Sequence, residues 1–180
     1  MQFKKKTSII FNIFIALILI GTLAACGGSL FSYRGGTVKA KNRIAVEAGG
    51  PHEGRWQTRD LAIDYAYQIN DNNLEISGVA ELAAFLKTGF TTLDHLFLWI
   101  NLLDVEGKVI ETKRIKSFGH HSWILTMGEM SFTRRLELTE ETAVIAFSYK
   151  GRVTEGGSKP SGTGTGGDAI FWNFWEVPQR

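Results

Sequence analysis

The chain contains 180 residues, with 20 lysines and arginines, 18 aspartates and glutamates, and a single cysteine. A formal net charge of +2 gives no broad field for holding nucleic acid, so we expect no nucleic-acid partner. One thiol excludes both a disulfide framework and cysteine-ligated zinc. The length suffices for one ordinary domain after a leader.

The first 26 residues have the pattern of a secretory signal. Lysines at positions 4–6 precede an uncharged, mostly apolar stretch from Thr7 to Ala25. This stretch ends in Leu23-Ala24-Ala25-Cys26, which resembles the lipobox of bacterial lipoproteins. An uncleaved transmembrane helix is the alternative, because a stretch of this length can span a bilayer.

The lipobox resemblance implies a lipid anchor. Leu23, Ala24 and Ala25 would be recognised by a signal peptidase, and residues 1–25 would be removed. Cys26 would then carry fatty acyl chains, which makes membrane lipid a partner. The domain would be extracytoplasmic, and Gly27 in place of Asp favours the outer membrane if the envelope is Gram-negative.

Residues 26–55 are expected to form a glycine-punctuated tether with a reach of about 30 Å. Within it, apolar and charged residues alternate between Val38 and Glu47, which indicates an edge strand. Cations at Lys39, Lys41 and Arg43 would touch anionic lipid or protect the strand edge from pairing. We expect the second role.

A domain over residues 56–180 is predicted to consist of strands. Alternation predicts an antiparallel hairpin over residues 61–82 with its turn at 70–73, whereas residues 83–92 fit either a bulged strand or a helical turn. The apolar run from Leu93 to Leu103 predicts a central strand that contains a core Trp99.

The rest of the chain completes the predicted sheet pattern. Asp104–Gly107 has the composition of a type I turn. Further strands are predicted at residues 109–115, 123–126, 130–138, 143–153 and 169–177, with a glycine-rich loop at 154–167. Seven or eight strands and no capped helix predict an all-β fold, an antiparallel β-sandwich of the immunoglobulin-like kind.

The segment from Leu102 to Val109, after the hydrophobic strand and after Ile76-Ser77-Gly78-Val79, is similar to the FxLYD-type domain of bacterial secreted proteins. The resemblance implies an immunoglobulin-like sandwich and no catalytic residues. Ile100 and Leu103 stand where that family has its Phe and Tyr.

No catalytic, metal or cofactor site is predicted. Adjacent His120 and His121 would point to opposite faces of a strand, and Asp94-His95 lacks a Gly-x-Ser-x-Gly nucleophile. The loop over 161–167 resembles a phosphate-binding loop only in its glycines. We therefore expect no enzyme, and a module that interacts with an envelope protein is the first hypothesis.

Aromatic residues near the C-terminus suggest the second hypothesis. In Phe171–Trp175, Phe171 and Trp175 share one side of a strand, and Trp172 and Phe174 share the other. Burial is the expected role of these rings. If Trp172 or Trp175 were exposed in a groove, they would be ligand-binding residues for carbohydrate or peptidoglycan.

Overall fold

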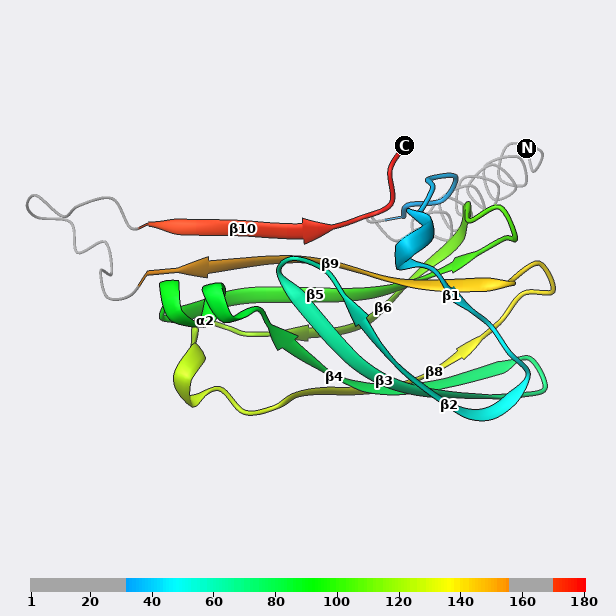
Figure 1. Ribbon diagram of the computed structural model, residues 1–180, viewed down its shortest axis with the longest axis horizontal. Coiled ribbons are helices and arrows are strands. Elements are labelled where there is room, and N and C mark those ends of the chain that lie inside the picture. The colour runs from blue at the N-terminus through cyan, green and yellow to red at the C-terminus, as the bar shows by residue number, and fades with distance from the viewer. Residues whose placement is uncertain (1–31, 156–169) are drawn as a thin grey trace, which may run out of the picture. The chain divides into compact units, whose positions relative to one another are not determined.

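The structure is a computed structural model that describes residues 32–155 and 170–180 (Figure 1). The predicted signal segment, the lipobox with Cys26, and most of the glycine-rich loop lie outside the described residues. In the described ranges, no helix is both long and apolar enough to cross a membrane.

Ten strands and three short helices follow one another along the described chain. They are η2 Ala40–Asn42, β1 Ile44–Ala45, β2 Gly49–Gln57, β3 Leu61–Asn70, β4 Asn73–Leu82, α2 Ala84–Gly89, β5 Thr92–Leu103, β6 Val109–Phe118, β7 Ser122–Trp123, η3 Ile124–Thr126, β8 Met130–Glu137, β9 Val144–Thr154 and β10 Phe171–Glu176.

The strands form two antiparallel sheets that pack against each other, so the fold is an all-β sandwich. Sheet I has the order β1-β9-β5-β6, with β10 also pairing with β9 and β7 also pairing with β5. Sheet II has the order β2-β3-β4-β8. The structure describes ten strands, more than the seven or eight expected. The strand without a predicted counterpart is β2, where glycines and Pro51 leave little alternation to read.

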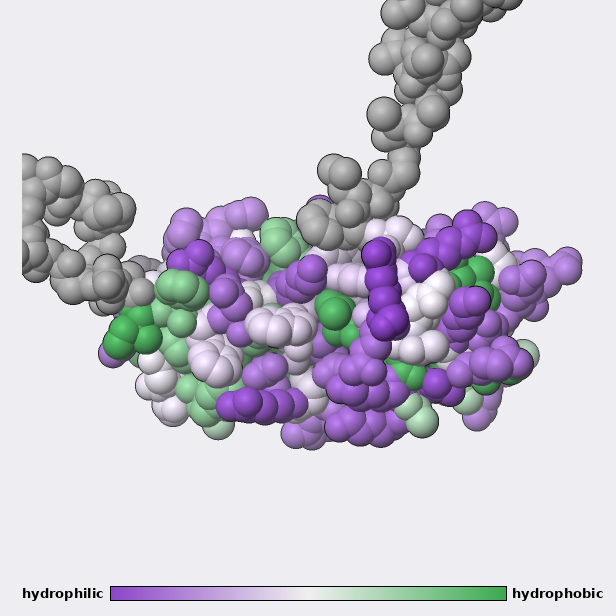
Figure 2. Space-filling view, turned by 90° about the horizontal axis from the view of Figure 1, so that it is seen from above, coloured by the Kyte–Doolittle hydropathy of each residue, from purple (hydrophilic) through white to green (hydrophobic). Residues whose placement is uncertain are grey.

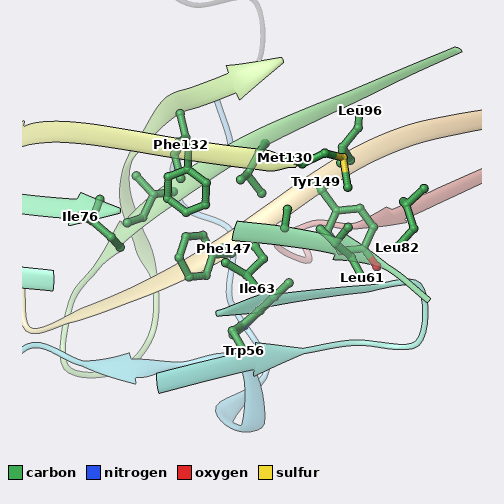
Figure 3. Close-up of a cluster of buried hydrophobic side chains, with 14 of the residues drawn as sticks. Trp56, Leu61, Ile63, Ile76, Leu82, Leu96, Met130, Phe132, Phe147 and Tyr149 are labelled. Atoms are coloured by element: carbon green, nitrogen blue, oxygen red, sulfur yellow. The ribbon is translucent and has the colours of Figure 1, made fainter. Parts of the chain in front are cut away.

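The core lies between the sheets, where alternate residues of each strand point inward (Figure 3). Fully buried leucines and isoleucines of β5 face their counterparts from sheet II, and each contributes about 1.5–3 kcal/mol of hydrophobic stabilisation. The residues labelled in Figure 3 belong to this core: Trp56, Leu61, Ile63, Ile76, Leu82, Leu96, Met130, Phe132, Phe147 and Tyr149.

Glycines on the inner faces make room for aromatic rings of the neighbouring strand. A side chain at Gly78 in β4 would meet the Phe132 ring of β8, and a side chain at Gly151 in β9 would overlap with the Phe174 ring of β10. Phe174 is consequently buried, which fixes β10 on the edge of sheet I.

The hairpin and the central strand are confirmed. β3 and β4 pair from Leu61 and Leu82 to Asn70 and Asn73, and Asp71 in the turn has a φ of 55°. β5 lies between β9 and β6 in sheet I, and the turn before β6 closes through a hydrogen bond from Gly107 N to Asp104 O of 3.1 Å.

Three expectations need correction. The sandwich begins before residue 56, because β2 at Gly49–Gln57 is an edge strand of sheet II. The edge strand expected over residues 38–46 is reduced to Ile44–Ala45, since residues 40–42 form a helical turn. The strand expected over residues 123–126 is mostly the 3-10 helix η3. The open segment 83–92 contains helix α2.

The segment from Tyr33 to Val38 covers part of the outer face of sheet I. The Tyr33 ring packs edge-on against Trp99, with ring centroids 6.4 Å apart. Val38 joins Leu103 in a second, smaller apolar cluster on this side of the sheet. Trp99 is therefore buried as predicted, but on the face opposite to the main core.

Candidate functional site

Next to the area covered by residues 33–38, the outer face of sheet I carries aromatic and cationic side chains from four neighbouring strands. We call it the aromatic–cationic face. Its residues are His95 and Phe97 of β5, Arg114 of β6, Lys150 and Arg152 of β9, and Phe171, Asn173 and Trp175 of β10.

Strand register brings these side chains together. Trp175 is paired with Lys150, and Lys150 is paired in turn with Phe97. One row further along, Asn173 is paired with Arg152, which is opposite His95. Directly paired residues point to the same side of a sheet at about 5 Å spacing, so a continuous patch forms from residues far apart in the sequence.

Trp175 stands at the edge of a shallow cleft of about 390 Å³. It is 60% exposed, whereas its neighbour Phe174 is 2% exposed. The cleft is also lined by His95, Lys150 and Asn173. A flat apolar ring beside an amide and an imidazole can stack on a ligand and form hydrogen bonds to it. The Lys150 ammonium lies over the Tyr33 ring, 5.9 Å from its centroid.

Cations on this face are stacked on aromatic rings. The Arg152 guanidinium carbon lies 4.2 Å from the centroid of Phe171, and that of Arg114 lies 4.8 Å from the centroid of Phe97. A cation over the face of an aromatic ring is attracted by the negative charge of that face. The face is therefore a pre-arranged set of rings and positive charges.

A β-bulge in β5 places Asp94 beside this face. The pairing of β5 with β9 shifts between Leu93 and His95, which leaves Asp94 as the extra residue. Thr154 Oγ1 donates a hydrogen bond of 2.6 Å to Asp94 Oδ2, and Arg152 Nε lies 3.2 Å from the same oxygen.

His121 completes the Asp94 cluster. Its Nδ1 lies 3.1 Å from Asp94 Oδ1, and the histidine side chain is 81% exposed. The threonine hydroxyl is directed at the carboxylate and not at the imidazole, so these groups do not form a nucleophile–base–acid series. His120 is exposed on the neighbouring loop. In the described part of the chain, no three His, Cys, Asp or Glu side chains gather as a metal site.

The expected burial of the C-terminal rings is wrong for three of the four. Phe171, Trp172 and Trp175 are 50%, 40% and 60% exposed, because β10 is an edge strand and only Phe174 finds space over a glycine. Figure 2 shows hydrophobic surface gathered at the end of the molecule where β10 begins.

Trp172 lies on the opposite side of β10 from Trp175. Its ring is 5.7 Å from the guanidinium carbon of Arg59, which is also 5.5 Å from the ring of Phe85. The two candidate tryptophans thus lie on opposite sides of β10, as the alternation of the sequence predicted. Sequence reasoning missed Lys150, because only the strand register brings it beside Trp175.

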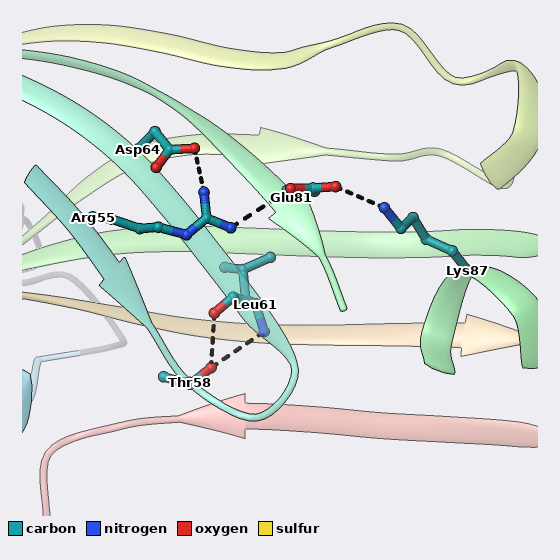
Figure 4. A network of polar contacts seen from close by, with 6 residues as sticks. All are labelled: Arg55, Thr58, Leu61, Asp64, Glu81 and Lys87. Atoms are coloured by element: carbon teal, nitrogen blue, oxygen red, sulfur yellow. Dashed lines mark hydrogen bonds and ion pairs between the residues drawn. The ribbon is translucent and has the colours of Figure 1, made fainter. Parts of the chain in front are cut away.

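The outer face of sheet II has a different character (Figure 4). Arg55 lies 2.6 Å from Asp64 and 3.8 Å from Glu81, and Lys87 lies 2.7 Å from Glu81. The hydrogen bond from Lys87 holds the pKa of the Glu81 carboxyl below its usual value. Each of these charges has an opposite partner, as is typical of a solvated structural surface.

A buried polar cluster lies near one end of the sandwich. The Tyr149 hydroxyl donates to Asp60 Oδ2 at 3.1 Å and contacts Thr58 Oγ1 at 2.7 Å. Burial raises the pKa of the Tyr149 hydroxyl well above its ordinary value. This cluster holds the β2–β3 turn against β9 and does not line the cleft beside Trp175.

Comparisons with known proteins add no relative: no family model, no curated protein and no solved structure is similar to this chain. The resemblances to lipoproteins and to FxLYD-type domains therefore stay predictions.

Proposed function

We propose that this protein is a lipid-anchored envelope lipoprotein whose β-sandwich is a non-enzymatic glycan-binding module. The observation that carries the proposal is the exposed ring of Trp175 at a cleft that also contains Lys150 and Asn173. Pyranose rings present C–H groups that pack on an indole, while their hydroxyl groups need donors and acceptors nearby.

The arrangement favours binding over catalysis. Among the residues that line the cleft, His95 has the side chain that enzymes most often use as a general base. Within the described residues, no carboxylate lines the cleft. Asp94, the nearest acid in β5, is already bound by Thr154 and Arg152. A shallow, preformed surface of this kind can hold a saccharide without a reacting group.

The proposal is tested by titrating the detergent-extracted full chain with a β-1,4-linked N-acetylglucosamine tetramer in a calorimeter. Trp175→Ala should weaken binding by about tenfold or more, because central aromatic anchors carry much of the energy of such contacts. Trp123→Ala is the matched control, since Trp123 is 59% exposed on β7. Equal affinities for wild type and Trp175→Ala would contradict the proposal.

The anchor is tested separately. Residues 1–25 should be absent from the mature protein, and its first residue should be an acylated Cys26. Mass spectrometry of the N-terminal peptide checks both points, and Cys26→Ser should abolish acylation. An intact Met1, or an unmodified thiol at Cys26 in the mature protein, would show that the chain is not a lipoprotein.

A further inference from the structure

We infer that one end of the sandwich inserts exposed apolar side chains into the surface of a lipid bilayer. This inference rests on the lipid anchor of the proposed function and adds a second membrane contact, made by the folded domain itself. Among the described residues, eight large apolar side chains are exposed, and six of them lie at this end. We call these six the apolar end: Phe85, Trp123, Leu125, Ile170, Phe171 and Trp172.

Strand pairing brings the apolar end together. Thr154, at the end of β9, pairs with Thr92 of β5 and with Phe171 of β10. Thr92 pairs in turn with Trp123 of β7. These pairs form one row across sheet I, at the end where β9 ends and β10 begins (Figure 1). Trp123 and Phe171 are therefore exposed rings at the two ends of a single row.

The other members lie around this row. A backbone hydrogen bond of 2.8 Å from Ile124 holds the helical turn η3, which carries Leu125, beside the start of β5. Trp172 and Phe85 lie on either side of Arg59, whose guanidinium carbon is 5.7 Å and 5.5 Å from their ring centroids. Helix α2 and the start of β10 thus meet at the same end of the molecule, where Figure 2 shows hydrophobic surface.

The side chains of the apolar end suit the boundary between lipid and water. Tryptophan combines a large apolar ring with an N–H donor, and it is enriched at that boundary in membrane proteins. Arg59 and Arg152, which lie over rings of this end, can keep the guanidinium in water while their stems lie along apolar surface. Leu125 is 88% exposed, which solubility alone does not require.

The length of chain before the domain selects a bilayer as the partner. Tyr33 packs on Trp99, and Thr92 lies seven residues before Trp99 in β5, which corresponds to about 23 Å of strand. The chain from Cys26 to Tyr33 spans about 25 Å when fully stretched. An acylated Cys26 can therefore lie level with the apolar end, and the bilayer that holds the acyl chains can receive these side chains.

Net charge contributes little to this contact. Two ion pairs near the apolar end are Arg152 with Asp94 and Lys87 with Glu81. Glu155, exposed after the end of β9, has a charge opposite to that of Arg59. Burial of apolar surface, and not attraction to anionic headgroups, would therefore hold this end in lipid. We expect insertion into a bilayer of zwitterionic phosphatidylcholine.

Fluorescence quenching in vesicles tests this inference. The detergent-extracted full chain is reconstituted into phosphatidylcholine vesicles with or without bromine on the acyl chains. Bromine quenches a tryptophan that it contacts, so the brominated vesicles should lower the emission. Replacement of Trp123 and Trp172 by Phe should remove most of this loss. Residues 1–55 contain no tryptophan, so the anchor itself contributes nothing to the signal.

A charge at the apolar end should block insertion. Leu125→Asp places a carboxylate among the inserted side chains, and the quenching should shrink by about threefold or more, because a carboxylate is poorly solvated by acyl chains. Val105→Asp is the matched control, since Val105 is 71% exposed in the turn after the opposite end of β5. It should keep the quenching. Thermal unfolding of both variants checks that the fold is intact.

The outcomes separate this inference from the proposed function. Equal emission in brominated and ordinary vesicles would overturn the inference, whereas the anchor fails only if the mass spectrum shows an unmodified Cys26. Equal quenching of Leu125→Asp and Val105→Asp would also overturn it, because the contact would not be made by the apolar end. Crosslinked dimers that Leu125→Asp abolishes, without any quenching, would assign this end to a second copy of the chain and would overturn the inference as well.

Discussion

The two outer faces of this sandwich are built from the same kind of strand and have opposite surface chemistry. On sheet II, the exposed charges of Asp64 and Glu81 are paired with those of Arg55 and Lys87. On sheet I, by contrast, Trp175 and Lys150 share a cleft. Exposed aromatic rings are unfavourable because their apolar surface stays in contact with water. Paired surface charges change the free energy of unfolding very little.

This contrast indicates which face of the sandwich to test for function. A face covered by paired charges keeps the protein soluble. Substitutions of its residues change the free energy of unfolding only slightly. A face with half-exposed rings leaves apolar side chains in contact with water, which solubility does not require. The following predictions test whether the two faces differ in this way.

The largest effect is expected at Trp99, on the covered part of sheet I. Trp99→Ala should lower the free energy of unfolding by about 3–5 kcal/mol, because a ring that is 4% exposed is removed from beneath Tyr33. Val79→Ala, on the outer face of sheet II, should cost less than about 1 kcal/mol. Urea unfolding measures both, and similar losses would mean that the Tyr33 segment does not protect sheet I.

A matched pair of glycines gives an intermediate effect. Gly151→Ala and Gly78→Ala should each lower the free energy of unfolding by about 1–3 kcal/mol. The new methyl group meets the ring of Phe174 in the first variant, and the backbone oxygen of Asp64 and the ring of Phe132 in the second. Gly151→Ala should also weaken glycan binding, because Phe174 seats the strand that carries Trp175.

Gly128→Ala is the control for that pair, because nothing lies within 4 Å of its added Cβ. It should leave both unfolding and binding almost unchanged. If Gly78→Ala weakened glycan binding as much as Gly151→Ala does, the ligand site would not be confined to sheet I.

The smallest effect is expected at Lys87. Its hydrogen bond lowers the pKa of Glu81, so this carboxylate stabilises the fold above its unfolded pKa, near 4.5, and the contribution is lost as the pH falls through the lowered value. Lys87→Met should cost under about 1 kcal/mol at neutral pH.

Chemical unfolding near pH 7 and near pH 3 checks this dependence. The wild type and Lys87→Met should converge at the lower pH, and glycan binding should be the same for both. A difference that persisted in acid would show that the Lys87 side chain stabilises by packing and not by charge.

Much of the sandwich could be predicted from the sequence, because its long strands alternate clearly. β3, β4 and β9 have almost the predicted bounds, and the run from Leu93 to Leu103 indicated a strand covered on both faces. The wrong expectations fall on short elements. Residues 40–42 and 124–126 form single helical turns. Three residues without a capping side chain give no helical signal in the sequence.

The candidate site could be predicted only in part. The alternation of Phe171–Trp175 placed Phe171 and Trp175 on one side, as the structure has them. Which side faces solvent depends on β10 being an edge strand, and that is a property of the sheet order. Lys150 is 25 positions from Trp175, and no local pattern reports such a register.

The close packing of Tyr33 on sheet I limits how far the sandwich could lie from Cys26. Only six residues separate Cys26 from Tyr33, and a fully stretched chain of that length spans about 25 Å. A fatty-acylated Cys26 would therefore keep the sandwich within a short distance of the bilayer. Any polymer that the module binds would then have to pass close to the lipid surface, because six residues do not let the module reach further.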